Sequence, residues 1–199
     1  MGGSRAVPSA FLPAWRAFPW EPAARPGDPF SPGYVHPAQG SGRFDLLDGG
    51  RGPLVLYLAE SPAHAVGEVM QPFRGRTVGD AHLRRHGRAI AVVEVRADAA
   101  TGLTVADLTR PAVMERLGVR PDVIASHDRR RTQAAARAVH AAGYAGLRWW
   151  SALTGEWHGL VLFLDRVAAG ALRWGTPEPI TPETPAMREA ARLLGFRLR

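Results

Sequence analysis

Proline is concentrated at the start of this 199-residue chain, where the first 53 residues carry nine of its 17 prolines. Proline lacks a backbone donor and clashes with the preceding helical turn, so a segment such as residues 21–29 cannot sustain a helix. In this region only residues 14–18 are predicted to form a short strand, and the rest is predicted to be loop. A loop this long in a compact domain is often a lid or a binding surface.

The length and the absence of cysteine limit the class of protein. About 200 residues suggest one domain, which can bury a core without covalent staples. Zero cysteine excludes a disulfide framework, a thiolate nucleophile and a Cys-ligated metal, and it fits the cytoplasmic location that we predict. Neither a membrane span nor a signal peptide is expected, because apolar runs are short and Pro8, Pro13 and Pro19 interrupt the N-terminal one.

The basic charge does not by itself indicate nucleic-acid binding. The formal net charge is +7, and all 25 basic residues are arginine. A basic nucleic-acid-binding module is therefore one hypothesis. However, the arginines are scattered among acids, and lysine and asparagine are both absent, which indicates compositional drift. The run Arg129, Arg130 and Arg131 is interpreted as a solvated helix face, with contact to an acidic partner or a phosphate backbone as the alternative.

The hydrophobic pattern predicts alternating strands and helices. The apolar run 54–59 is typical of a strand, and Ser61 and Pro62 then suit the cap and first position of a helix over 62–70. Asp128 is expected to cap a longer helix that Gly143 ends. Further strands are predicted at 88–96, 103–105, 145–150 and 159–164, and further helices at 111–117, 128–142 and 182–194.

Most familiar catalytic signatures are missing. The chain has no Walker A loop, no nucleophile elbow and no HExxH pair. His82 and His86 lack a third ligand at a suitable spacing, so no metal site is predicted. Tyr57 and Glu68 can line one cleft, since a strand ends just before the helix that carries Glu68. Taken singly, Tyr57 is more often a core residue than a catalytic one, and periodicity favours a solvated face position for Glu68 over a buried functional carboxylate.

One block of the chain resembles a known family. Residues 42–69 contain a Gly-Arg-aromatic turn, an apolar strand ending in Tyr-x-Ala-Glu-Ser, and a helix with Ala-x-x-Glu. Trp15-Arg16 upstream, and residues 144–151 with the strand after them, also fit the pattern. This arrangement resembles the RES domain family over about residues 14–166. We therefore expect a flexible N-terminal segment at 1–13, a RES domain at 14–170, and a C-terminal extension with a helix at 171–199.

The resemblance implies a fold, an activity and partners. RES domains are α+β proteins with a single mixed domain and a split central sheet, similar to ADP-ribosyltransferases. The family implies a bacterial toxin that depletes NAD+ by cleaving its nicotinamide–ribose bond, through phosphorolysis or hydrolysis. NAD+ is then a substrate, inorganic phosphate a candidate co-substrate, and no cofactor is expected. The implied partner is a neighbouring antitoxin with a helix-turn-helix part, through which alone the toxin would meet DNA.

The resemblance also implies roles for five residues. Arg43 and, less specifically, Arg16 are expected at the phosphates of NAD+, where a guanidinium binds well. Tyr57 is expected beside the nicotinamide or ribose, and Glu68 near the cation-like ribose of the transition state. Ser151 is expected to bond the ligand near the scissile bond.

The chain departs from the family at the turn after Arg43. Phe44-Asp45 replaces the usual Trp-Asn, and residues 48–52 look like an inserted turn. The acceptor therefore stays open between phosphate, water and a protein side chain. A protein acceptor would make the chain an ADP-ribosyltransferase.

Overall fold

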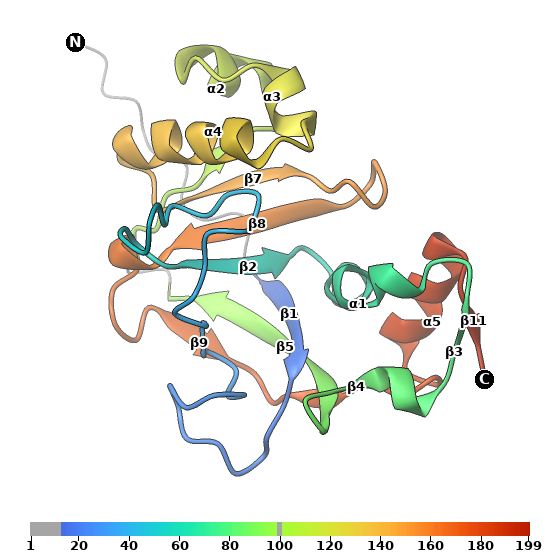
Figure 1. The fold of residues 1–199 in the computed structure, drawn as a ribbon. Coiled ribbons are helices and arrows are strands. Elements are labelled where there is room, and N and C mark those ends of the chain that lie inside the picture. The colour runs from blue at the N-terminus through green and yellow to red at the C-terminus, as the bar shows by residue number, and fades with distance from the viewer. Residues whose placement is uncertain (1–12, 99–100) are drawn as a thin grey trace.

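The computed structural model describes residues 13–98 and 101–199 as an α+β fold (Figure 1). The strands are β1 Ala14–Pro19, β2 Val55–Ala59, β3 Thr77–Val78, β4 Arg84–Arg85, β5 Arg88–Ala97, β6 Ala106–Asp107, β7 Gly146–Trp150, β8 His158–Phe163, β9 Leu172–Trp174, β10 Glu178–Pro179 and β11 Arg197–Leu198. The α-helices are α1 Pro62–Met70, α2 Pro111–Arg116, α3 Pro121–Ala125, α4 Arg129–Ala141 and α5 Pro185–Leu194.

The large sheet is divided near its middle. Its strand order is β10-β5-β1-β2-β8-β7-β6, and β4 and β9 also pair with β5. β1 pairs with β5 along its whole length, and β2 does so with β8. Between β1 and β2, in contrast, the register holds only the pair Trp15 and Ala59. The two halves therefore diverge from that pair, which confirms the predicted mixed fold with a split central sheet.

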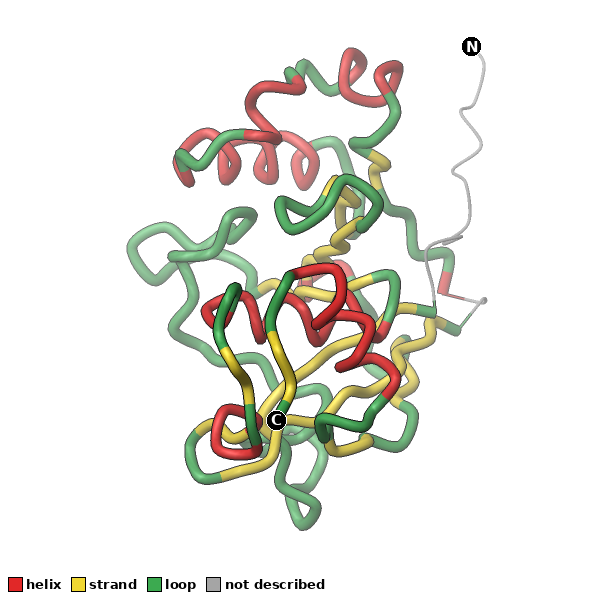
Figure 2. The backbone as a smooth tube through the Cα atoms, turned by 90° about the vertical axis from the view of Figure 1, so that its right-hand side faces the viewer, coloured by secondary structure: helices red, strands yellow, loops and turns green. Residues whose placement is uncertain are grey.

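Each half of the sheet has its own helical layer. Helices α2, α3 and α4 cover the half that contains β7 and β8, whereas α1 and α5 pack together beside β1 and β5 (Figures 1 and 2). The first core includes Val139, Leu147 and Phe163, and the second includes Met70 and Met187, all fully buried. A substrate-sized space can form between two such separately packed halves.

The helix caps follow the sequence. The Ser61 hydroxyl accepts from the backbone N–H of His64 at 3.1 Å, and this cap fixes the start of α1 directly after β2. Asp128 caps α4 in the same way, by accepting from the N–H of Arg130 at 2.9 Å. Both caps agree with the predictions, and such caps satisfy backbone donors that a helix leaves unpaired.

Short elements differ from the sequence predictions. The strand expected at 103–105 is wrong, since the two-residue strand β6 lies at Ala106–Asp107, where it pairs in parallel with β7. Helix α3 and strands β3, β4, β9, β10 and β11 are not foreseen. These segments are too short for a periodic pattern. Strands β3, β9, β10 and β11 form by pairing with strands distant in sequence, whereas β4 pairs with β5, which follows it directly.

The two predicted terminal segments lie on either side of the domain expected at residues 14–170. The predicted flexible segment 1–13 falls outside the described residues except at residue 13. After residue 170, β9 and β10 pair with β5, and α5 packs on α1. The segment expected as an extension therefore contains sheet strands as well as the expected helix.

Candidate active site

A cavity of about 640 Å³ lies at the split between β1 and β2. Its walls come from the facing edges of these two strands, the proline-rich loop, helix α1 and the start of α4. The loop contributes His36, Gln39 and Arg43, so the segment predicted to be a binding surface does line the cavity. The aromatic side chains of Trp15, Tyr57 and Trp149 also line it, and the list of charged or titratable wall residues is Arg16, His36, Arg43, Tyr57, Glu68, His127 and Arg129.

Glu68 presents a carboxylate to this cavity from α1. Its side chain is 49% exposed, yet one of its oxygens is held from behind. The Ser151 hydroxyl donates to Oε1 at 3.2 Å, and Nε2 of His64 lies 3.0 Å from the same oxygen. The contact with His64 spans one turn of α1, where residues four apart share a face.

Ser151 lies behind Glu68 and is not among the residues that line the cavity. It is 7% exposed, and its hydroxyl oxygen accepts from the N–H of Leu153 at 3.1 Å while its hydrogen goes to Glu68. Ser151 therefore contacts the carboxylate that faces the cavity, and its expected contact with the ligand stays a prediction.

Tyr57 joins the cavity wall to the turn around Arg43. Its hydroxyl donates to Oδ1 of Asp45 at 2.8 Å and accepts from the N–H of Phe44 at 2.9 Å. Burial, reinforced by the Asp45 carboxylate, raises the pKa of Tyr57 well above its ordinary value. The phenol therefore stays protonated at neutral pH, as a wall and an anchor rather than a base.

Asp45 also holds the backbone of this turn. Its Oδ2 accepts from the N–H groups of Gly40 and Gly42, both at 2.7 Å. A Cβ on Gly42 would lie 2.6 Å from the Tyr57 hydroxyl, so only glycine allows this close approach. The aspartate that departs from the family pattern thus gains four hydrogen-bonding roles in shaping the loop before Arg43, counting its own N–H to Gly42 O.

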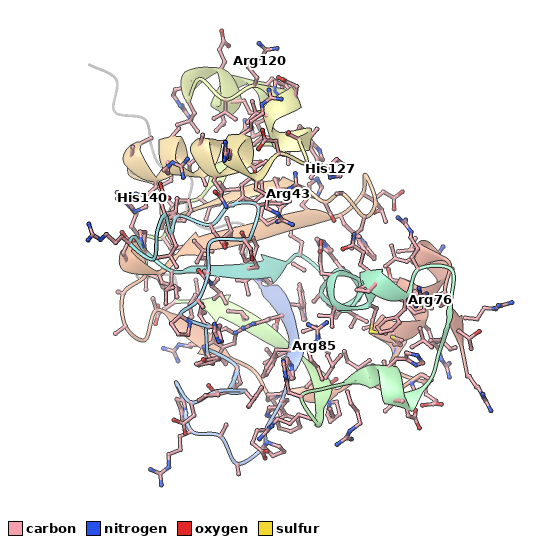
Figure 3. The ribbon with its side chains drawn as sticks, in the orientation of Figure 1. Arg43, Arg76, Arg85, Arg120, His127 and His140 are labelled. Atoms are coloured by element: carbon pink, nitrogen blue, oxygen red, sulfur yellow. The ribbon has the colours of Figure 1, made fainter. Side chains whose placement is uncertain are left out.

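Arg43 reaches across from this loop toward α3. One of its Nη groups donates to the carbonyl of Ile124, and the guanidinium lies 5.4 Å from the centroid of the Phe44 ring. Burial lowers the pKa of Arg43, the charge of Glu68 opposes this, and Arg129 adds to it. These influences place Arg43 within electrostatic range of both a carboxylate and a second cation. In Figure 3, Arg43 and His127 lie near each other beneath α4, and both line the cavity.

Arg16 faces the cavity from β1, on the other side of the split. Its Nη1 donates to the carbonyl of Pro32 at 2.6 Å, which ties the strand to the proline-rich loop. Burial lowers the pKa of Arg16 to about 10, so the group is still cationic at neutral pH. The structure therefore brings Arg16, Arg43, Tyr57 and Glu68 to one cavity.

Comparison with known proteins identifies the family of the chain. The model of the RES domain family matches residues 13–183. The chain belongs to the RES domain family. A chain in the crystal structure of the M. tuberculosis MbcT–MbcA toxin–antitoxin complex has a similar fold, with a TM-score of 0.58 and 23% sequence identity over 90% of this chain and 88% of that chain. No curated protein matches this RES domain.

Several residues of the site in this RES domain were not foreseen, among them Asp45, His64 and Arg129. Asp45 and His64 contact residues that line the cavity, and Arg129 lines it. Arg129 is also exposed, as expected for the solvated face predicted for its arginine run. His64 stands four residues before Glu68, and this spacing was a usable signal. Nothing in the sequence around Arg129 shows that the start of α4 meets the proline-rich loop.

Within residues 13–98 and 101–199, no group of three or more His, Asp or Glu side chains could hold a metal ion. In the same part of the chain, no helix is long and apolar enough to cross a membrane.

Proposed function

We propose that this RES domain binds NAD+ in the cavity and cleaves its nicotinamide–ribose bond. The observation that carries the proposal is the Glu68 carboxylate, which is half exposed in a cavity with arginines on its walls. Nicotinamide leaves as a neutral group when the bond breaks, so no strong general acid is needed. Positive charge builds up on the ribose instead, and a nearby carboxylate stabilises it.

The arginines suit the other end of the same substrate. NAD+ carries a diphosphate, and guanidinium groups bind phosphate oxygens through paired hydrogen bonds. Arg43 and Arg129 lie on the side of the proline-rich loop and α4, whereas Arg16 lies on β1. A dinucleotide held between them would place its ribose toward Glu68. The aromatic rings of Trp15, Tyr57 and Trp149 offer stacking area.

Any of three acceptors would complete the reaction. The electron pair of the broken bond leaves with nicotinamide, and an oxygen of the acceptor forms the new bond to the ribose carbon. Inorganic phosphate gives ADP-ribose 1″-phosphate, water gives ADP-ribose, and either reaction releases one proton. Transfer to a protein side chain is the third outcome, which would make this RES domain an ADP-ribosyltransferase.

We further propose that the chain is the toxin of a toxin–antitoxin pair that depletes cellular NAD+. Its fold resembles a chain from a toxin–antitoxin complex, and its family membership supports the same role. The partner would be an antitoxin with a helix-turn-helix part that binds DNA, so the +7 charge would meet a protein surface rather than nucleic acid. Co-expression with the product of a neighbouring gene should restore growth of cells that the chain alone arrests.

The decisive experiment follows free nicotinamide. Purified protein is incubated with NAD+, with and without inorganic phosphate, and the products are separated by chromatography. Glu68→Gln should slow nicotinamide release about 100-fold or more, since it removes the charge that favours the transition state. Glu189→Gln is the matched control, because Glu189 is an exposed glutamate on α5 outside the cavity.

The products separate the acceptors. Phosphate dependence with ADP-ribose 1″-phosphate indicates phosphorolysis, ADP-ribose in either buffer indicates hydrolysis, and label on an added protein indicates transfer. Absence of nicotinamide release from the wild type, or equal rates for the two variants, would contradict the proposal.

A further inference from the structure

His64 is a buried histidine whose environment the proposed reaction does not yet explain. Its side chain is 1% exposed, and its ring stacks on Trp157 with centroids 5.0 Å apart and planes inclined by 23°. One ring nitrogen, Nε2, lies 3.0 Å from Oε1 of Glu68. The other, Nδ1, is buried and has no hydrogen-bond partner among the described residues.

These contacts decide where the proton of the imidazole sits. A carboxylate accepts hydrogen bonds, so the nitrogen that faces Glu68 must carry the hydrogen. A second proton on Nδ1 would be a buried donor without an acceptor, which is unfavourable. The environment therefore selects the neutral ring with hydrogen on Nε2, and Nδ1 carries only a lone pair.

The surroundings also fix the orientation of the ring. Trp157 lies across α1 at Gly67, where a Cβ would come within 2.7 Å of the indole. The His64 backbone is fixed as well, because its N–H donates to the Ser61 cap. The ring is thus held between α1 and the segment 151–157, and its Nε2–H cannot follow a Glu68 side chain that moves away.

We infer that His64 is a positioning residue for Glu68, an inference that rests on the proposed function. His64 and Ser151 donate to the same oxygen, Oε1. Among the described residues, Oε2 has no hydrogen-bond partner, and the side chain is half exposed to the cavity. Two neutral donors therefore fix the carboxylate without cancelling its charge, and Oε2 is left for the ribose of the substrate.

Two substitutions at this position separate positioning from packing. His64→Leu keeps an apolar side chain against Trp157 but removes the donor, whereas His64→Gln retains an N–H that can reach Glu68. His64→Leu should lower kcat for nicotinamide release at least about 10-fold with KM within about threefold, because a misplaced catalytic group slows the bound complex. His64→Gln should recover most of the lost rate.

A matched control uses a surface histidine. His82 is exposed and does not line the cavity, so His82→Leu should leave kcat unchanged. Equal losses for His64→Leu and His64→Gln, or a wild-type kcat in His64→Leu, would overturn the inference.

A spectroscopic readout keeps the inference testable without turnover or a folded leucine variant. In wild-type protein with isotope-labelled histidine, the nuclear magnetic resonance signals of His64 should report hydrogen on Nε2 and none on Nδ1. Glu68→Gln should shift the Nε2–H signal. A ring with hydrogen on Nδ1, or one that is doubly protonated at neutral pH, would overturn the inference. If the expected signals occur but the wild type releases no nicotinamide, the proposed function fails while the contact stands.

Discussion

Glu60 directly follows β2, and Glu68 lies farther along on α1. The two carboxylates differ in how many of their oxygens other side chains bind. Both oxygens of Glu60 bond to the guanidinium of Arg148, one of them at 3.0 Å, and His158 lies 3.2 Å away. Arg148 also donates to Asp107 at 3.2 Å. Glu68, in contrast, meets two donors at one oxygen and leaves the other toward the cavity.

The difference separates a carboxylate that holds two strands together from one that leaves an oxygen toward the cavity. Arg148 alternates with Trp149 on β7, so it projects from the face of the sheet opposite the one on which Trp149 lines the cavity. Its bidentate bond with Glu60 ties the end of β2 to β7, and those two strands lead into α1 and the segment of Ser151. The ion pair between Glu60 and Arg148 thus helps to fix the relative positions of the two segments that carry Glu68 and Ser151.

The largest expected change in stability comes from removing the ion pairs of Arg148. Arg148→Met leaves Glu60 and Asp107 partly buried without their cation, since the Arg148 side chain is only 16% exposed. The free energy of unfolding should fall by about 3 kcal/mol in urea denaturation. Arg120→Met is the control, because Arg120 pairs with Asp122 but is 79% exposed. The Arg120→Met variant should lose less than about 1 kcal/mol of unfolding free energy. Equal losses in the two variants would contradict the difference between the partly buried and the exposed ion pair.

A smaller loss of stability is expected at the Tyr57 anchor. Tyr57→Phe leaves Oδ1 of Asp45 and the N–H of Phe44 without their partner, which should cost about 1–2 kcal/mol of unfolding free energy. Because the folded state raises the Tyr57 pKa, this phenol keeps its proton when the unfolded chain loses it.

The advantage of the wild type over Tyr57→Phe is therefore complete below the ordinary tyrosine pKa near 10 and declines as pH rises above it. Urea denaturation at pH 8 and at pH 11 should show the difference shrinking by about 1 kcal/mol. A difference that is constant with pH would indicate a phenol that ionises normally.

The smallest expected effect on stability is that of changing Glu68. Glu68 is half exposed and bonds to neutral groups, so Glu68→Gln should change the free energy of unfolding by no more than about 0.5 kcal/mol. Thermal and urea denaturation beside the wild type measure this. A loss as large as that of Arg148→Met would mean that Glu68 supports the fold and that its loss of activity is secondary.

The comparison also explains what the sequence could predict. Tyr57, Ser61 and Glu68 lie close together in the chain, and one strand followed by a capped helix positions them, so a local pattern suffices. Helix α1 and its cap were predicted with their observed residues. The contact of Ser151 with Glu68, in contrast, depends on which way a hydroxyl turns at the end of β7. Only the packing of segment 151–157 on α1 determines that.

Contacts between residues far apart in the chain could not be predicted either, because the packing of distant segments decides them. Arg148 and Glu60 are 88 residues apart in the chain. No sequence pattern around either residue indicates that the other is its partner. Arg129 reaches the cavity only because the proline-rich loop folds against the start of α4, where Gln133 donates to the carbonyls of Gly40 and Gly42, both at 2.9 Å.

The most direct test compares the two glutamates in one assay. Nicotinamide release from NAD+ is measured for the wild type, Glu60→Gln and Glu68→Gln at a temperature at which circular dichroism shows all three to be folded. The rate of Glu60→Gln should stay within about threefold of the wild type, whereas Glu68→Gln should lose about 100-fold or more. Equal losses in the two variants, or a Glu68→Gln variant as fast as the wild type, would contradict the assignment of Glu68 as the carboxylate that acts on the substrate.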